Sequence, residues 1–106
     1  GLGYFCLNAV TTGDSNVAIG RQALNTNSTG GYNTVVGKQA LYANTTGQRN
    51  TASGYRALYL NTTGSYNAAV GSCALYDNTT GHSNTASGFY SLANNSTGCK
   101  NTAVGA

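Results

Sequence analysis

The chain has 106 residues, a net charge of +3 and 7% charged residues, with no Pro, Met or Trp. This length limits it to one small domain or a piece of a longer array, and no apolar run is long enough to cross a bilayer or to form the core of a signal peptide. Low charge and a composition rich in Gly, Ser, Asn and Thr are typical of disorder, so the arrangement of the residues decides between order and disorder.

A unit close to Asn-Thr-Ala-Val-Gly-x-x-Ala-Leu-x-x-Asn-Thr-Thr-Gly-x-x repeats every 17 residues without insertion or deletion. A partial unit, 1–15, precedes the full units 16–32, 33–49, 50–66, 67–83 and 84–100 and the partial unit 101–106. A constant register predicts one solenoid over 1–106, with each unit as one coil of a stack. Seventeen residues are too few for a pair of packed helices, so we expect an all-β solenoid of the parallel β-roll or β-helix type.

Each coil opens with a short predicted strand that has aliphatic or β-branched residues at its second and fourth positions. The Gly that ends this strand predicts a corner with positive φ or close backbone contact. The next segment, such as 21–27, is either a second strand or a single helical turn, because local propensity favours the turn and stacking favours the strand. A Thr-Gly pair predicts the second corner.

Each coil supplies a thin interior of one Leu, one aliphatic residue and a few Ala or Cys, against about 1–2 kcal/mol of backbone entropy per residue. We expect ladders of identical Asn and Thr side chains and side-by-side packing of several chains to add stability. The Asn ladder is Asn16, Asn33, Asn50, Asn67, Asn84 and Asn101, and the Leu column is Leu24, Leu41, Leu58, Leu75 and Leu92. The column expected to be buried between chains is Ala18, Val35, Ala52, Ala69, Ala86 and Ala103.

Two coils differ from the others in a correlated way. They have Ser53 and Ser87 at the fourth strand position and an aromatic residue, Tyr55 or Phe89, two residues later. Residues i and i+2 of a strand share a face, so the aromatic ring compensates for the lost aliphatic surface. This alternation predicts a double unit of 34 residues.

The run 16–20, Asn-Val-Ala-Ile-Gly, and its echoes at 33–37 and 101–105 resemble the head repeats of trimeric autotransporter adhesins. The full unit is longer than that repeat and is similar to repeats of phage and algal-virus tail fibres and of large bacterial surface proteins. The resemblance covers essentially the whole chain. It implies a left-handed parallel β-roll, a homotrimer and a shaft or head role, and it carries over no functional residue. Any export signal is expected outside this sequence.

No column of residues predicts catalysis, a metal site or a cofactor. His82 has no fixed carboxylate partner in its column, and Asp14 and Asp77 occupy different columns. The five cations fall in three columns and form no continuous stripe along which a phosphate backbone could lie. We therefore expect a protein that is not an enzyme, with no cofactor and no nucleic-acid partner.

The cysteines Cys6, Cys73 and Cys99 lie in three different columns. Coils stack about 4.8 Å apart, which places Cys6 and Cys73 roughly 19 Å apart, too far for a disulfide. They are interpreted as incidental small residues, with a bridge to another chain through Cys99 as the alternative.

Five Asn residues match the N-glycosylation pattern: Asn27, Asn44, Asn61, Asn78 and Asn95. Glycans on coils about 4.8 Å apart would collide, so capping or ladder Asn residues followed by turn residues are the preferred interpretation.

Tyrosines form the candidate contact columns. Tyr42, Tyr59 and Tyr76 share one column, and Tyr32 and Tyr66 share another with Arg49 between them. Stacked rings would stiffen the stack or pack against another chain. The alternative is an aromatic face presented to sugars.

The sequence thus predicts a structural segment of an extracellular or virion fibre, located at a cell or virion surface. We expect a homo-oligomer, either a trimer or an end-to-end filament, with a host surface or glycan as the outside contact and no membrane insertion. The alternative is a carbohydrate-binding or ice-binding solenoid. The Thr column for ice is Thr12, Thr29, Thr46, Thr63, Thr80 and Thr97.

Overall fold

The first stretch of each unit forms a three-residue strand in the computed structural model, which describes residues 13–105. Each strand residue pairs in parallel with its counterpart one coil later, as Ala18 does with Val35. No helix occurs within 13–105, so the predicted all-β solenoid is confirmed. The predictions on Cys6 and Thr12 fall outside the described residues. In sheet order the strands are β1 (Val17–Ile19), β2 (Thr34–Val36), β3 (Thr51–Ser53), β4 (Ala68–Val70), β5 (Thr85–Ser87) and β6 (Thr102–Val104).

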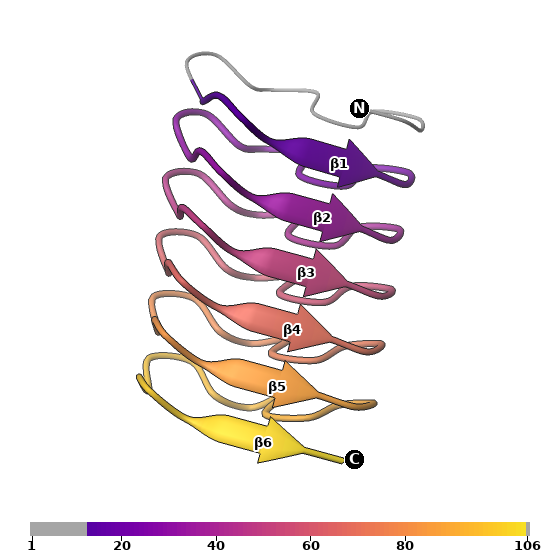
Figure 1. The fold of residues 1–106 in the computed structure, drawn as a ribbon, viewed down its shortest axis with the longest axis vertical. Helices are drawn as coiled ribbons and strands as arrows, with labels where there is room; N and C mark the ends of the chain where they lie inside the picture. The colour runs from indigo at the N-terminus through magenta and orange to yellow at the C-terminus, as the bar shows by residue number, and fades with distance from the viewer. Residues whose placement is uncertain (1–12, 106) are drawn as a thin grey trace.

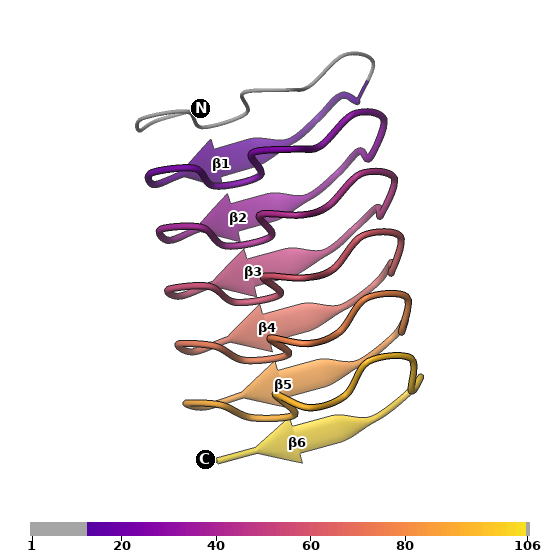
Figure 2. The same ribbon diagram turned by 180° about the vertical axis from the view of Figure 1, so that it is seen from behind.

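The coil is left-handed. In Figure 1 the chain runs from left to right along the near strands and returns behind them while it descends from the first coil to the last. Figure 2 shows the same stack from behind, with the return segments in front. The molecule measures 32 × 20 × 17 Å, and the coils stack along the longest dimension.

Glycine is required at both predicted corners, for different reasons. Gly20, which follows β1, has a φ of 124°, and a Cβ on it would lie 2.7 Å from the carbonyl carbon of Gly37. Gly30, of the Thr-Gly pair, has no unusual φ. A Cβ there would collide with the carbonyl oxygen of Gly47 and would lie 2.5 Å from Oδ1 of Asn27. The second glycine is therefore selected by close packing between coils.

The return segment is neither the second strand nor the helical turn that the sequence left open. In the coil 33–49, Gln39 has a φ of 58° and Leu41 a φ of 50°. The backbone N–H of Gln39 donates to the carbonyl oxygen of Arg21 in the preceding coil at 2.9 Å. The backbone N–H of Leu41 donates to the carbonyl oxygen of Ala57 in the following coil at 2.8 Å. Left-handed residues thus turn the peptide groups up and down the stack, so that the segment bonds to both neighbours while it curves.

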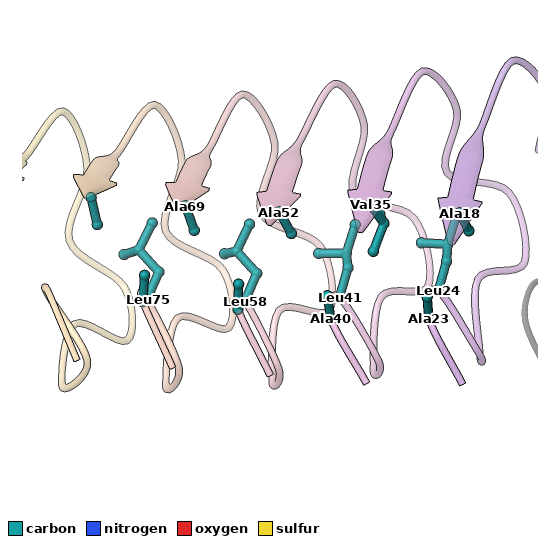
Figure 3. Packing of buried hydrophobic residues seen from close by; sticks show 13 residues of the cluster. Ala18, Ala23, Leu24, Val35, Ala40, Leu41, Ala52, Leu58, Ala69 and Leu75 are labelled. Atoms are coloured by element: carbon teal, nitrogen blue, oxygen red, sulfur yellow. The ribbon is translucent and has the colours of Figure 1, made fainter. Parts of the chain in front are cut away.

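The apolar core lies between the strands and the return segments (Figure 3). The middle residue of each strand points inward and its neighbours point outward, as in β2, where Val35 is buried and Val36 is 42% exposed. The expectation that the Ala18–Ala103 column lies between chains is therefore wrong for the five buried members, because they face Leu side chains of their own stack. The interior is so narrow that a strand residue opposite Leu must be small.

Two columns of Asn side chains run through the stack beside this core. In the first, the Asn50 N–H donates to Oδ1 of Asn33 at 2.9 Å, and the Asn50 side chain donates to Gly64 at 2.9 Å. In the second, Asn61 donates to Oδ1 of Asn44 at 2.9 Å and to Gly64 at 3.0 Å. Every buried side-chain N and O of the described residues has a hydrogen-bond partner, so these ladders avoid the cost of orphaned polar groups.

Candidate interaction surface

The described residues enclose no pocket, and they contain no group of three His, Cys, Asp or Glu side chains that could hold a metal ion. Cys73 is a buried free thiol and Cys99 an exposed one. Within 13–105 no helix has the length and apolar character that a membrane crossing needs.

The predicted ladder residues are structural and lie inside. Leu24, Leu41, Leu58 and Leu75 are fully buried, Leu92 is partly buried, and the Asn column is buried from Asn33 to Asn84 and half-buried at Asn16 and Asn101. These side chains face other coils, and no ligand from outside contacts them without opening the stack.

The glycosylation motifs coincide with the second Asn column. Asn27, Asn44, Asn61 and Asn78 are buried, and their side-chain amides donate within the stack. A glycan on any of them would require the coil to open, which supports the turn-residue interpretation. The following Thr column is exposed at Thr29, Thr46, Thr63, Thr80 and Thr97.

One outer surface is the outward face of the sheet. The first and third residues of β1–β6 point outward and are only Val, Ile, Thr, Ser and Ala, with no charge. Val17 is 51% exposed and Val70 50%. Half of these outward residues are aliphatic and the other half are Thr or Ser, so the outward strip is an uncharged face on which exposed Val and Ile side chains alternate with hydroxyl groups.

A second surface, the aromatic corner, consists of Lys38, Gln39, Tyr42, Tyr55, Arg56, Tyr59 and Tyr76. The rings of Tyr42 and Tyr59 stack at 5.2 Å with an interplanar angle of 19°, and Tyr59 and Tyr76 stack at 5.1 Å and 17°. The three rings were singled out from the sequence as one column, and the stack brings them together. Because Tyr59 has a ring on each side, it offers its ring edge and hydroxyl group and no open face.

Two cations border these rings. The Arg56 guanidinium carbon lies 5.0 Å from the ring centres of both Tyr55 and Tyr59, and its Nε donates to Oε1 of Gln39 at 2.8 Å. Lys38 Nζ lies 5.9 Å from the Tyr55 ring. Cation–π contacts of this kind hold a charged group in place.

Phe89 and Tyr90 extend the aromatic surface into the coil 84–100. Their rings meet edge to face at 4.4 Å and both are more than half exposed. A hydrogen bond with the Cys73 side chain is the main cause that raises the pKa of Tyr90 above 10.0, and the electrostatic interaction with Cys73 is the next. The neutral phenol is thereby favoured.

The second predicted tyrosine column also forms. The Arg49 guanidinium carbon lies 4.8 Å from the Tyr32 ring centre and 6.0 Å from that of Tyr66. These side chains belong to the corner before the strands, and Tyr66 is 62% exposed.

Two features of the surface were missed at the sequence level. The outward strip does not follow from the expectation that the Ala column lies between chains, because that expectation turns the opposite strand face outward. The signal was present: the middle strand position stays small in every coil, while its neighbours vary among Val, Thr, Ser, Ala and Ile. The Tyr55–Arg56–Tyr59 cluster was missed because these residues lie in three columns, which only a known turn geometry brings together.

Comparison of the chain with family models, with curated proteins and with solved structures gives no match.

Proposed function

We propose that this chain is a structural segment of an extracellular or virion fibre, in which stacked coils form a rigid rod and the outside contacts other chains or a target surface. The observation that carries the proposal is the continuous bonding between coils. The strands, the return segments, the corners and the Asn side chains all donate hydrogen bonds to the corresponding part of a neighbouring coil.

The corners also bond each coil to the next. The backbone N–H groups of Ser28, Thr29 and Gly30 all donate to the carbonyl oxygen of Thr45 at 3.1 Å, and the next coils repeat the arrangement. A stack bonded on every side resists bending in all directions, which is what a load-bearing shaft requires.

The outward strip of β1–β6 supports lateral assembly. The first and third residues of the strands include exposed Val and Ile side chains among Thr and Ser, and none of them is charged. Burying apolar surface contributes about 25 cal/mol per Å², so side-by-side packing of chains through this strip, in a trimer or another multimer, would stabilise a thin-cored rod.

The test compares the assembly of variants that carry two added Lys residues either on the outward strip or elsewhere on the surface. We expect the unaltered chain to form multimers in sedimentation equilibrium and rods in electron micrographs, and Val36→Lys with Val70→Lys to dissociate them. The matched control, Thr46→Lys with Thr80→Lys, adds the same charge on the exposed Thr column and should assemble normally. A stable monomer of 10.8 kDa for the unaltered chain would overturn lateral assembly.

Ice binding is a second candidate, favoured by the exposure of five Thr residues in one column at one per coil. A regular row of Thr side chains is suited to ordering water. A thermal-hysteresis measurement decides it: activity that disappears in Thr63→Lys would support ice binding, and no activity in the unaltered chain would exclude it.

A further inference from the structure

We propose that the aromatic corner binds an extended, anionic β-1,4-linked polysaccharide, which lies along the stacking axis with its carboxylates at Arg56 and Lys38. This binding goes beyond the proposed role as a rod and does not depend on assembly of the chains, so either proposal can fail alone.

The solenoid does not require an aromatic residue at position 55 or a cation at position 56. Tyr55 and Arg56 occupy positions that hold Ser72 and Cys73 one coil later and Lys38 and Gln39 one coil earlier. The coil geometry is the same in all three, with positive φ at Gln39, Arg56 and Cys73. An aromatic residue and a cation at this place therefore serve the surface and not the coil.

Arg56 is held in a fixed position with donors to spare. Two rings lie against its guanidinium, and Gln39 accepts from its Nε at 2.8 Å. A guanidinium has five N–H donors, and in the part of the chain that the structure describes no carboxylate accepts from Arg56 or Lys38. A preorganised guanidinium without an internal carboxylate is suited to an external one.

The tyrosine column supplies a repeating set of hydroxyl groups. The ring centres of Tyr42, Tyr59 and Tyr76 are 5.2 and 5.1 Å apart. Each hydroxyl can donate one hydrogen bond and accept others. This spacing is close to the rise per sugar in an extended β-1,4-linked pyranose chain, so successive sugars would meet successive tyrosines.

Single-stranded nucleic acid is the competing anionic polymer, and the geometry disfavours it. Bases bind such proteins by stacking on open aromatic faces. Tyr59 is enclosed by Tyr42 and Tyr76, and the Tyr55 ring has Arg56 and Lys38 near it. The corner therefore offers polar edges and cations, which suit sugar hydroxyls and carboxylates better than bases.

The experiment titrates the intact chain with three hexamers by calorimetry: β-1,4-linked mannuronate, neutral β-1,4-linked mannose and oligothymidylate. Mannuronate should bind and mannose should bind at least about tenfold more weakly, since it lacks the carboxylates. Arg56→Gln should weaken mannuronate binding about tenfold. Tyr59→Phe keeps the ring stack, removes one hydroxyl and should weaken binding about threefold.

Arg49→Gln is the matched control, because it removes the same charge from a cation that also lies between two tyrosine rings at the other corner. It should leave mannuronate binding unchanged. Equal losses in Arg56→Gln and Arg49→Gln would mean unspecific charge attraction and would overturn the site. Equal binding of mannuronate and mannose, tighter binding of oligothymidylate, or no binding of mannuronate would each overturn it as well.

Discussion

The side-chain amide of Asn44 donates to Oδ1 of Asn27 at 2.7 Å, from one coil to the one before it. The same amide donates to Gly47 of its own coil at 3.0 Å. One buried side chain thus closes its own corner and ties it to the previous coil. This double role makes the column sensitive to small chemical changes.

Asn61→Asp should cost about 3 kcal/mol of unfolding free energy at pH 7, because a buried carboxylate would face the acceptors Asn44 Oδ1 and Gly64 O. Burial beside acceptors raises the pKa of such a carboxyl above its ordinary value of about 3.9. A raised pKa in the folded state means that stability is present below the unfolded pKa and is lost as pH rises through the folded pKa. The variant should therefore be more stable at pH 4 than at pH 7.

Urea denaturation at the two pH values measures this effect. Asn94→Asp, on an exposed side chain beside the ladder, makes the same chemical change and should stay within about 0.5 kcal/mol of the unaltered chain. A loss in Asn94→Asp as large as that in Asn61→Asp would contradict the ladder explanation.

Gly30→Ala and Gly31→Ala separate two adjacent glycines. The Gly30 Cβ would collide with the Gly47 carbonyl oxygen, whereas the nearest atom to a Gly31 Cβ is the Asp14 carbonyl oxygen at 3.1 Å. We expect Gly30→Ala to lose about 3 kcal/mol by overpacking, and Gly31→Ala to be close to neutral. Thermal unfolding followed by circular dichroism compares them, and similar melting temperatures would refute the packing argument.

Ser83→Gly should stabilise the chain by about 0.5–1 kcal/mol. Ser83 has a φ of 58° and an exposed side chain, and an L-residue in this region costs about 1–2 kcal/mol, more than the added flexibility of glycine in the unfolded chain. Ser72→Gly, where φ is not positive, should instead destabilise. The sign of the difference in denaturation midpoint is the test, and destabilisation by both substitutions would disprove it.

Tyr59→Ala should cost about 2–3 kcal/mol, since it removes two stacked pairs and the Arg56 contact. Tyr59→Phe should retain most of that stability. If the two variants unfold at the same denaturant concentration, ring stacking contributes nothing to the rod.

Cys73→Ala should lower the pKa of Tyr90 toward 10.0, because the hydrogen bond with Cys73 is the main cause of its rise. In the unaltered chain the neutral phenol is favoured by folding, so this contribution is present below the unfolded pKa and lost as pH rises through the folded one. Carbon NMR of labelled tyrosine follows the titration. An unchanged Tyr90 pKa would exclude Cys73 as the cause.

Much of the fold follows from the sequence, since a constant register with Leu and Gly at fixed phases admits few structures besides a stack of coils. The return segment could not be predicted, because positive φ at Gln39 and Leu41 contradicts the preference of both residue types and is maintained by bonds to the neighbouring coils. Without that geometry, the contact of Arg56 with Tyr55 and Tyr59 could not be found either. Which face of each strand points inward could not be predicted for a simpler reason. Ala is compatible both with the interior of one chain and with an interface between chains.

Each buried column places nearly the same residue in every coil, and this affects how the folding chain pairs its coils in the correct register. Asn44 would meet the same partners if the chain were displaced by one whole coil, since Asn27 and Asn61 are chemically identical. Displaced stacks would therefore be deep kinetic traps, distinguished from the native one mainly at the ends and by outside residues such as Tyr55 and Arg56. Differences between the outer side chains of successive coils thus favour the native register over displaced ones during folding.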